Sequence, residues 1–235
     1  MSVSNTYMGR LGNNLFQYMM ARVYAEKNGF NISTEWIHQD VIPLTQPAPG
    51  ATVTDKWQHI DEQNISEELY NACNTTIGTS FGGFFQYSKY YMPNREKIKS
   101  YCKKQYKLQN TKDIVMHVRC DDYGRIHWIH PSWYKSILDQ EQYDNLYLVM
   151  NPIDNEYIET MKDYNPIIKS GTVQEDFEFI SGFSKIIMSN STYAWWAAFL
   201  GEPEKVYTFK KWLSTPFQDI TELNNSITVD GAYWQ

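Results

Sequence analysis

Residues 117–123, His-Val-Arg-Cys-Asp-Asp-Tyr, place a cation and two carboxylates directly after an apolar run. The guanidinium of Arg119 presents a planar fork of N–H donors, which suits the paired oxygens of a diphosphate. An ion pair at the end of an ordinary strand accounts for the same residues. Taken alone, this segment favours that simpler explanation, so its meaning depends on what lies beside it.

Residues 189–192, Ser-Asn-Ser-Thr, come just before an expected helix. Backbone N–H groups and hydroxyls at the start of a helix form a site for an anion. The competing explanation is a simple helix cap, which is the more common use of these residue types. The segment therefore indicates either a phosphate-binding turn or a helix start.

Residues 9–14, Gly-Arg-Leu-Gly-Asn-Asn, contain two glycines that permit a tight turn and the close approach of a ligand. The pattern is neither a dinucleotide fingerprint nor a P-loop, because no Gly-Lys-Ser/Thr follows. A fourth group joins Tyr193 to Trp195 and Trp196. Adjacent tryptophans on a helix cannot share one face. We expect them to pack in the core and against a neighbouring element, more than to stack on a sugar.

The elements that must position these segments differ between the two halves of the chain. Near the start, an apolar repeat predicts a helix with Asn13 as N-cap and Gly29 as its stop. Residues 39–80 are expected to be irregular. The second half alternates strands with helices, at residues 113–119, 131–142, 145–150, 154–164, 166–169, 174–183, 185–189, 191–200 and 205–209. This alternation predicts a parallel α/β sheet with helices on both faces, and ligands at its carboxyl edge.

Composition limits the classes of function. A length of 235 residues suits one large domain or two small ones. Hydrophobic residues make up 42% of the chain, which is enough to bury a core. The net charge of −6 argues against a nucleic-acid-binding surface, so an anionic ligand must be held by a few placed cations. The aromatic share of 16% suits sugar-binding walls and suits a tyrosine-rich core equally well. Trp36, Trp57 and Trp128 are open to both readings.

The cysteines and the missing motifs narrow the setting. Cys73, Cys102 and Cys120 have no metal-binding spacing and leave an odd thiol in any pairing scheme, which favours a reducing compartment. No signal peptide or integral membrane segment is apparent, so we expect a cytoplasmic protein. The sequence has no Asp-x-Asp triplet and no Cys/His metal set, and it predicts no metal site.

Four segments, in order, resemble the α-1,2-fucosyltransferase family and, more distantly, the α-1,6- and protein O-fucosyltransferases. The family opens with Gly-Gly-Leu-Gly-Asn-Gln-x-Phe-Gln-Tyr, which is similar to residues 9–18. Its Gly-Tyr/Phe-Phe-Gln-x-x-x-Tyr piece is similar to residues 83–90. Its His-Val-Arg-Arg-Gly-Asp-Tyr motif resembles residues 117–123, and its Ser-Asn-Ser-Thr-Phe-Ser-Trp-Trp motif resembles residues 189–196. One such match is weak, whereas four in the family's order are specific.

The resemblance implies a GT-B-like α/β fold, with two Rossmann-type halves facing a cleft. The N-terminal half, residues 1–112, would be small, irregular and on the acceptor side. The C-terminal half, residues 113–235, would bind the nucleotide sugar. The implied reaction is an inverting, metal-independent transfer of L-fucose from GDP-fucose to a glycan hydroxyl. The resemblance implies no cofactor besides this donor substrate.

The resemblance also assigns residues. Arg119 would hold the donor diphosphate, and His117 would lie beside the nucleotide. Ser191 and Thr192 would fall on the phosphate-contacting turn. Asn13 matches a position near the donor sugar and the acceptor.

Two further assignments come from counting along the relatives' motifs. In the α-1,6 relatives, an Asp that binds guanine lies sixteen residues before the last hydroxyl residue of the phosphate-binding turn. The same count back from Thr192 reaches Asp176 in this chain. The proposed base of the α-1,6 relatives, ten residues after the motif histidine, corresponds to His127. Asp121 and Asp122 are rivals for that role.

Two departures from the family pattern matter: Cys120 replaces the second Arg of the third motif, and Asp121 replaces its Gly. A diphosphate that loses one charge-assisted bond should be held less tightly. Arg10 or Arg125 could compensate. Otherwise the donor differs, such as GDP-rhamnose or UDP-xylose, or the chain is a catalytically inactive sugar-nucleotide-binding protein.

Overall fold

The computed structural model describes residues 2–52, 56–65, 77–120, 128–210 and 226–229. His127, Asp122, Asp121 and Arg125 lie outside these residues. The described chain forms two compact units, the first ending at Lys104 and the second beginning at Gln105. Within the described residues, no helix is both long and apolar enough to cross a membrane.

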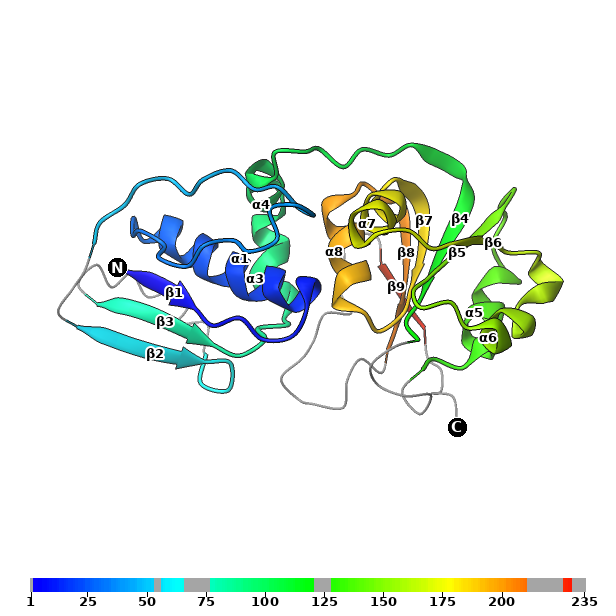
Figure 1. The fold of residues 1–235 in the computed structure, drawn as a ribbon, viewed down its shortest axis with the longest axis horizontal. Coiled ribbons are helices and arrows are strands. Elements are labelled where there is room, and N and C mark those ends of the chain that lie inside the picture. The colour runs from blue at the N-terminus through cyan, green and yellow to red at the C-terminus, as the bar shows by residue number, and fades with distance from the viewer. Residues whose placement is uncertain (1, 53–55, 66–76, 121–127, 211–225, 230–235) are drawn as a thin grey trace. The chain divides into compact units, whose positions relative to one another are not determined.

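The first unit contains a small parallel sheet in the order β1-β3-β2 (Figure 1). Its strands are β1 (Val3–Asn5), β2 (Trp57–Asp61) and β3 (Gly78–Gly82). α1 (Leu11–Lys27) packs against β1 and β3, and is followed later in the chain by α3 (Ser88–Tyr91), η1 (Met92–Asn94) and α4 (Arg95–Tyr101). The expectation that residues 39–80 are irregular is therefore wrong. These short strands are specified by pairing with distant segments, which a local pattern does not reveal.

The first helix starts earlier than its sequence pattern predicted. α1 begins at Leu11, with Arg10 at the N-cap position and no side-chain cap. Asn13 is therefore not the N-cap, and its side-chain oxygen instead accepts from Nε2 of Gln86 at 3.0 Å. The left-handed backbone of Gly9, with φ of +78°, turns the chain into the helix before Asn13 is reached.

A buried arginine ties the first unit together. Arg22, only 2% exposed, donates to the carbonyl oxygens of Thr45 at 2.7 Å and Gln46 at 3.3 Å. Its Nε pairs with Glu26 at 3.1 Å, and its guanidinium carbon lies 3.8 Å from the centroid of the Tyr101 ring. One side chain of α1 thereby fastens a loop on one side and α4 on the other.

The second unit contains a six-stranded parallel sheet in the order β6-β5-β4-β7-β8-β9. Its strands are β4 (Asn110–Val118), β5 (Leu146–Met150), β6 (Ile167–Lys169), β7 (Phe183–Met188), β8 (Lys205–Phe209) and β9 (Ser226–Val229). Numbered from β4, this order is 3-2-1-4-5-6, the arrangement of a Rossmann-like doubly wound sheet. The predicted parallel α/β architecture is confirmed. β9 was not expected.

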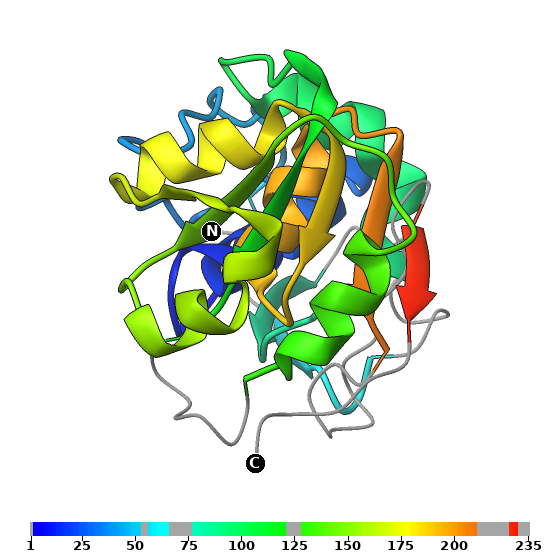
Figure 2. The same ribbon diagram turned by 90° about the vertical axis from the view of Figure 1, so that its right-hand side faces the viewer.

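Helices cover both faces of this sheet. They are α5 (Pro131–Leu138), α6 (Asn155–Thr160), α7 (Val173–Ser181) and α8 (Thr192–Leu200), with the short η3 (Lys162–Tyr164) after α6. Figures 1 and 2 show α5 and α6 on one face, and α7 and α8 on the other. All four predicted helices are present, although α5 and α6 end earlier than expected. The change of face falls between β4 and β7, where the strand order reverses.

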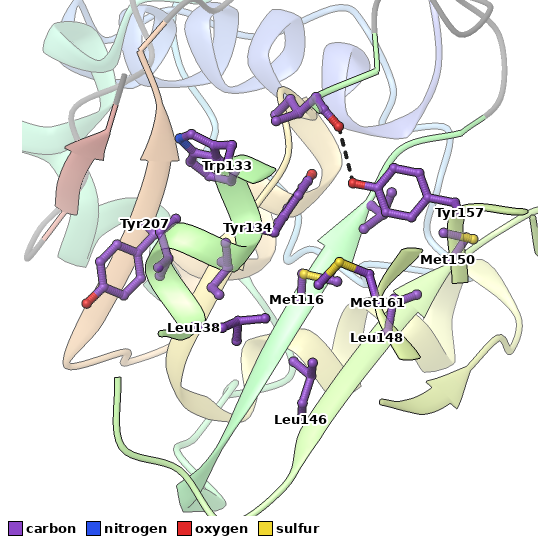
Figure 3. Packing of buried hydrophobic residues seen from close by; sticks show 14 of the residues in the cluster. Met116, Trp133, Tyr134, Leu138, Leu146, Leu148, Met150, Tyr157, Met161 and Tyr207 are labelled. Carbon is purple, nitrogen blue, oxygen red and sulfur yellow. Dashed lines mark hydrogen bonds between the residues drawn. The ribbon is translucent and has the colours of Figure 1, made fainter. Parts of the chain in front are cut away.

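The face under α5 and α6 is filled by large side chains (Figure 3). Tyr134 and Tyr157 lie with their ring centroids 6.3 Å apart, next to Met116 and Met161. The Tyr134 hydroxyl donates to the backbone carbonyl of His117 and the Tyr157 hydroxyl to that of Ile129, because a buried hydroxyl needs a partner. The cluster gives β4 and β5 a rigid support.

The tryptophan pair of α8 belongs to the core of the other face. Trp195 and Trp196 are both fully buried. The ring of Trp195 stacks on Phe199 at 4.9 Å, and that of Trp196 meets the same ring nearly edge-on at 5.0 Å. Core packing is thus confirmed over sugar stacking. Of the other tryptophans considered, Trp36 and Trp128 are buried, and Trp57 is exposed.

The buried guanidinium of the first unit makes a testable stability prediction. Arg22→Met should lower the free energy of unfolding by about 3–5 kcal/mol, because Glu26 and the two loop carbonyls lose a buried partner. Lys162→Met, which removes an exposed ion pair with Glu159, is the control and should cost less than about 1 kcal/mol. Urea denaturation measures both. Similar losses in the two variants would contradict a central role for Arg22.

Candidate functional site at the carboxyl edge of the second sheet

The point where β4 and β7 run side by side is the natural ligand position in this sheet. β4 is followed by α5 on one face of the sheet and β7 by α8 on the other, so the strand order reverses between these two strands. The residues opposite each other at this end are His117 and Met188. β4 ends at Val118 and β7 at Met188. The two predicted motifs, residues 117–123 and 189–192, therefore begin at neighbouring strand ends.

His117 is joined directly to the second motif. Its Nδ1 lies 2.8 Å from Oγ of Ser189, and its carbonyl oxygen accepts from the backbone N–H of Ser189 at 3.2 Å. Both residues are buried. Alternation along β4 sends Met116 and Val118 into the cluster under α5, and turns His117 to the α8 face. The Ser189 hydroxyl thus holds the imidazole, and a backbone hydrogen bond joins the main chain of His117 to the same residue.

Arg119 is the first residue after β4 and is only partly buried. Its Nη1 donates to the backbone carbonyl of Asn190 at 3.3 Å, which draws the guanidinium over the turn that leads into α8. Asn190 is 3% exposed, and its side-chain Nδ2 has no partner within the described part of the chain. The predicted cation and the predicted turn therefore lie together.

The turn itself is a capped helix start. Ser191 is the N-cap of α8, and its Oγ accepts from the backbone N–H of Ala194 at 3.4 Å. Thr192 is the first residue of the helix and is half-buried. The helix-cap explanation of this segment is therefore correct for the Ser191 hydroxyl. A capped helix still directs the positive end of its dipole toward the strand ends, where Arg119 lies.

Asp176 lies on the first turn of α7, within a well-built helix start. Thr172 caps this helix and forms a reciprocal capping box with Glu175. Oδ1 of Asp176 accepts from the backbone N–H of Gly171 at 2.9 Å, and its other oxygen has no hydrogen bond among the described residues. Asp176 as a residue is 4% exposed, and burial raises the pKa of its carboxyl above the ordinary value of 3.8.

Tyr193 links the separate pieces, a role that sequence reasoning missed. Its ring centroid lies 5.9 Å from that of His117 and 5.4 Å from that of Phe177, the neighbour of Asp176. Its hydroxyl donates to the carbonyl of Val173 at 2.5 Å. Burial, together with the nearby Asp176 charge, raises the pKa of Tyr193. In the sequence Tyr193 stands beside the tryptophan pair, and no local pattern shows that it bridges α7 and α8.

Other predicted site residues are placed elsewhere. Asn13 belongs to the first unit, in the first turn of α1. Cys120 is 5% exposed and packs in the cluster with Tyr134 and Tyr157. Its side chain therefore contributes to the core, and not to the group around Arg119. The base candidates His127 and Asp122 fall outside the described residues.

The arrangement combines a half-buried cation, a helix N-terminus and a partly engaged carboxylate at one sheet edge. The guanidinium and the helix dipole favour an anionic group, such as a phosphate. A carboxylate that keeps one free acceptor oxygen favours a ligand with N–H or O–H donors. No group of three His, Cys, Asp or Glu side chains in the described ranges is placed to hold a metal ion. These features suit a ligand with both a phosphate and a hydrogen-bonding base.

No family model, curated protein or solved structure matches this chain. The likeness of its four motifs to the fucosyltransferases therefore stays an inference from the sequence.

The bond between His117 and Ser189 is open to a direct test. Ser189→Ala should lower the free energy of unfolding by about 1–3 kcal/mol, because a buried imidazole nitrogen loses its partner. Ser136→Ala, which removes an exposed hydroxyl on α5, should change it by less than about 0.5 kcal/mol. Urea denaturation under identical conditions compares the two. If the variants behaved alike, Ser189 would not be holding His117.

Proposed function

We propose that the chain is an inverting, metal-independent glycosyltransferase that takes L-fucose from GDP-fucose to a glycan hydroxyl. One observation carries the proposal. His117, Arg119 and the turn at residues 189–192 lie together at the carboxyl ends of β4 and β7, where the strand order of the sheet reverses. These residues are far apart in the sequence. A Rossmann-like sheet binds its ligands at this point of reversal, outside the carboxyl ends of the strands.

The donor side of the proposal divides among three groups. Arg119 and the start of α8 would hold the diphosphate, both in the bound donor and as the leaving group gains charge. His117 would lie beside the nucleotide, oriented by Ser189. Asp176 would accept from the N1 and N2 hydrogens of guanine, a donor pair that adenine does not offer. Its unengaged oxygen and the adjacent Gly171 backbone support this assignment.

The proposed transfer also needs an acceptor site and a base. Inversion requires that the acceptor hydroxyl lose its proton as the new bond forms. His127 and Asp122 stay predictions for that role, and Asn13 stays a prediction for a contact near the donor sugar and acceptor. A cytoplasmic setting and a role in glycan biosynthesis belong to the same proposal.

The alternative is a catalytically inactive sugar-nucleotide-binding protein, and Cys120 is the observation that favours it. With its thiol in the core, position 120 adds no charge where the family has its second Arg. A transferase should hydrolyse its donor slowly when no acceptor is present, whereas an inactive protein would bind the donor and leave it intact. The same hydrolysis assay would identify a different donor, such as GDP-rhamnose or UDP-xylose, as the compound that is hydrolysed.

The diphosphate role of Arg119 predicts a specific loss of binding. Calorimetric titration without metal should show binding of GDP and GDP-fucose in preference to UDP. Arg119→Ala should weaken GDP binding by roughly 10–100-fold, as expected for one charge-assisted contact. Lys162→Ala removes one positive charge from η3, which precedes β6 and so lies away from the carboxyl edge. This control should bind as the unchanged protein does. Unaltered affinity in Arg119→Ala would overturn the proposed donor site.

The guanine role of Asp176 predicts a dependence on pH. Only the ionised carboxyl can accept from both guanine donors, and burial raises its pKa. GDP affinity should therefore be full above this raised pKa and be lost as the pH falls through it. Asp176→Asn should bind GDP and UDP alike and lack this term. Phosphate protonation affects both proteins equally, so the difference between their pH profiles isolates Asp176. Identical profiles would contradict the assignment.

A further inference from the structure

The first unit contains a network of buried amides whose orientation can be deduced. Oε1 of Gln17 accepts from the backbone N–H of Met8 at 3.0 Å, and its Nε2 donates to the carbonyl of Gly83 at 3.1 Å. An N–H can only donate and a carbonyl can only accept, so these partners fix both ends of the Gln17 amide. Gln17 is fully buried.

The same reasoning fixes the neighbouring amide. Nδ2 of Asn14 donates to the carbonyl of Met8 at 3.1 Å and to Oε1 of Gln17 at 3.2 Å. Its oxygen, Oδ1, is then the atom that lies 2.8 Å from Nε2 of His38. Because this oxygen only accepts, Nε2 must carry the hydrogen. The neutral His38 ring therefore has its lone pair on Nδ1.

The imidazole is held in place from a second side. The ring of Trp36 meets that of His38 at 5.2 Å and 66°, and Trp36 is itself fastened by its bond to the Ile42 carbonyl at 2.8 Å. Burial lowers the pKa of His38 below its ordinary value of 6.5, opposed by Asp40, the charged group that acts on the ring. His38 is therefore neutral at about pH 7, with Nδ1 as an acceptor.

The surroundings indicate what this nitrogen would accept from. Nδ1 has no hydrogen-bond partner among the described residues, and the ring is only half-buried. Met8, bonded to the same amides, is 38% exposed, and Ile37, next to His38, is 55% exposed. A neutral acceptor near the Asp40 carboxylate disfavours anions. A hydroxyl group on a partly apolar molecule suits it, and a sugar has both a donor hydroxyl and apolar faces.

We propose that the first unit binds a carbohydrate hydroxyl at Nδ1 of His38, which Asn14 holds in the accepting tautomer. The choice of a sugar rests on the proposed function, because the transfer needs an acceptor hydroxyl. A hydroxyl bound here donates to a nitrogen that is able to receive its proton. The geometry of Asn14 and Gln17 stands independently of that function.

Nitrogen-15 NMR of the histidine side chains in the full chain tests the proposal. At about pH 7, His38 should show the tautomer with hydrogen on Nε2. Lactose, N-acetyllactosamine and galactose are the probes, each titrated to about 10 mM and above, the range of weak binding. At least one should shift the His38 Nδ1 resonance in a saturable way. His130 is the internal control, because its Nδ1 already accepts from the Ser132 N–H at 3.2 Å.

Two results would overturn the proposal: hydrogen on Nδ1 of His38 in the free protein, or no saturable shift with any of the three sugars. His38→Gln should abolish sugar binding and leave GDP titration unchanged. Sugar binding by this variant at full strength would also overturn the proposal. GDP binding without sugar binding would refute this site alone, and sugar binding without GDP binding would refute the proposed donor site alone.

Discussion

The parallel pairing of β4 with β7 is the constraint on which the second unit depends. These strands run together through buried registers up to His117 and Met188, and then the chain departs to opposite faces. The pairing places residues 117–119 beside residues 189–192. The support comes from both faces, with Tyr134 and Tyr157 under one and the tryptophans of α8 under the other. A change in that pairing would separate every group proposed to hold the donor.

Much of the hydrogen-bonding capacity of the motifs is used inside the protein. Ser191 caps its own helix, Ser189 holds an imidazole, and Asn14 and Gln17 bind each other and the backbone. This follows from burial, because a buried polar group without a partner is costly. The polar residues of such motifs therefore serve mainly to fix geometry.

Cys120 illustrates how tertiary placement changes the meaning of a substitution. In the sequence it appears as a lost arginine beside Arg119, and hence as a weakened diphosphate clamp. In the structure its side chain lies in the apolar cluster with Tyr134 and Tyr157, while that of Arg119 reaches the Asn190 carbonyl. Successive residues leaving a strand point to opposite sides. The thiol therefore fits the packing of that core, and Arg119 is left as the cation at the turn.

The sequence alone was sufficient for the parallel α/β architecture of the second unit, because its strands and helices are long, apolar and regularly alternating. It also identified residues 117–119 and 189–192 as belonging to one edge, since parallel strands end together. It did not reveal β1, β2, β3 or β9, which are short and are specified by pairing with distant segments. Nor could it show that Tyr193 bridges two helices, or which nitrogen of His38 accepts. Those features depend on contacts between residues far apart in the chain, and only the folded structure decides them.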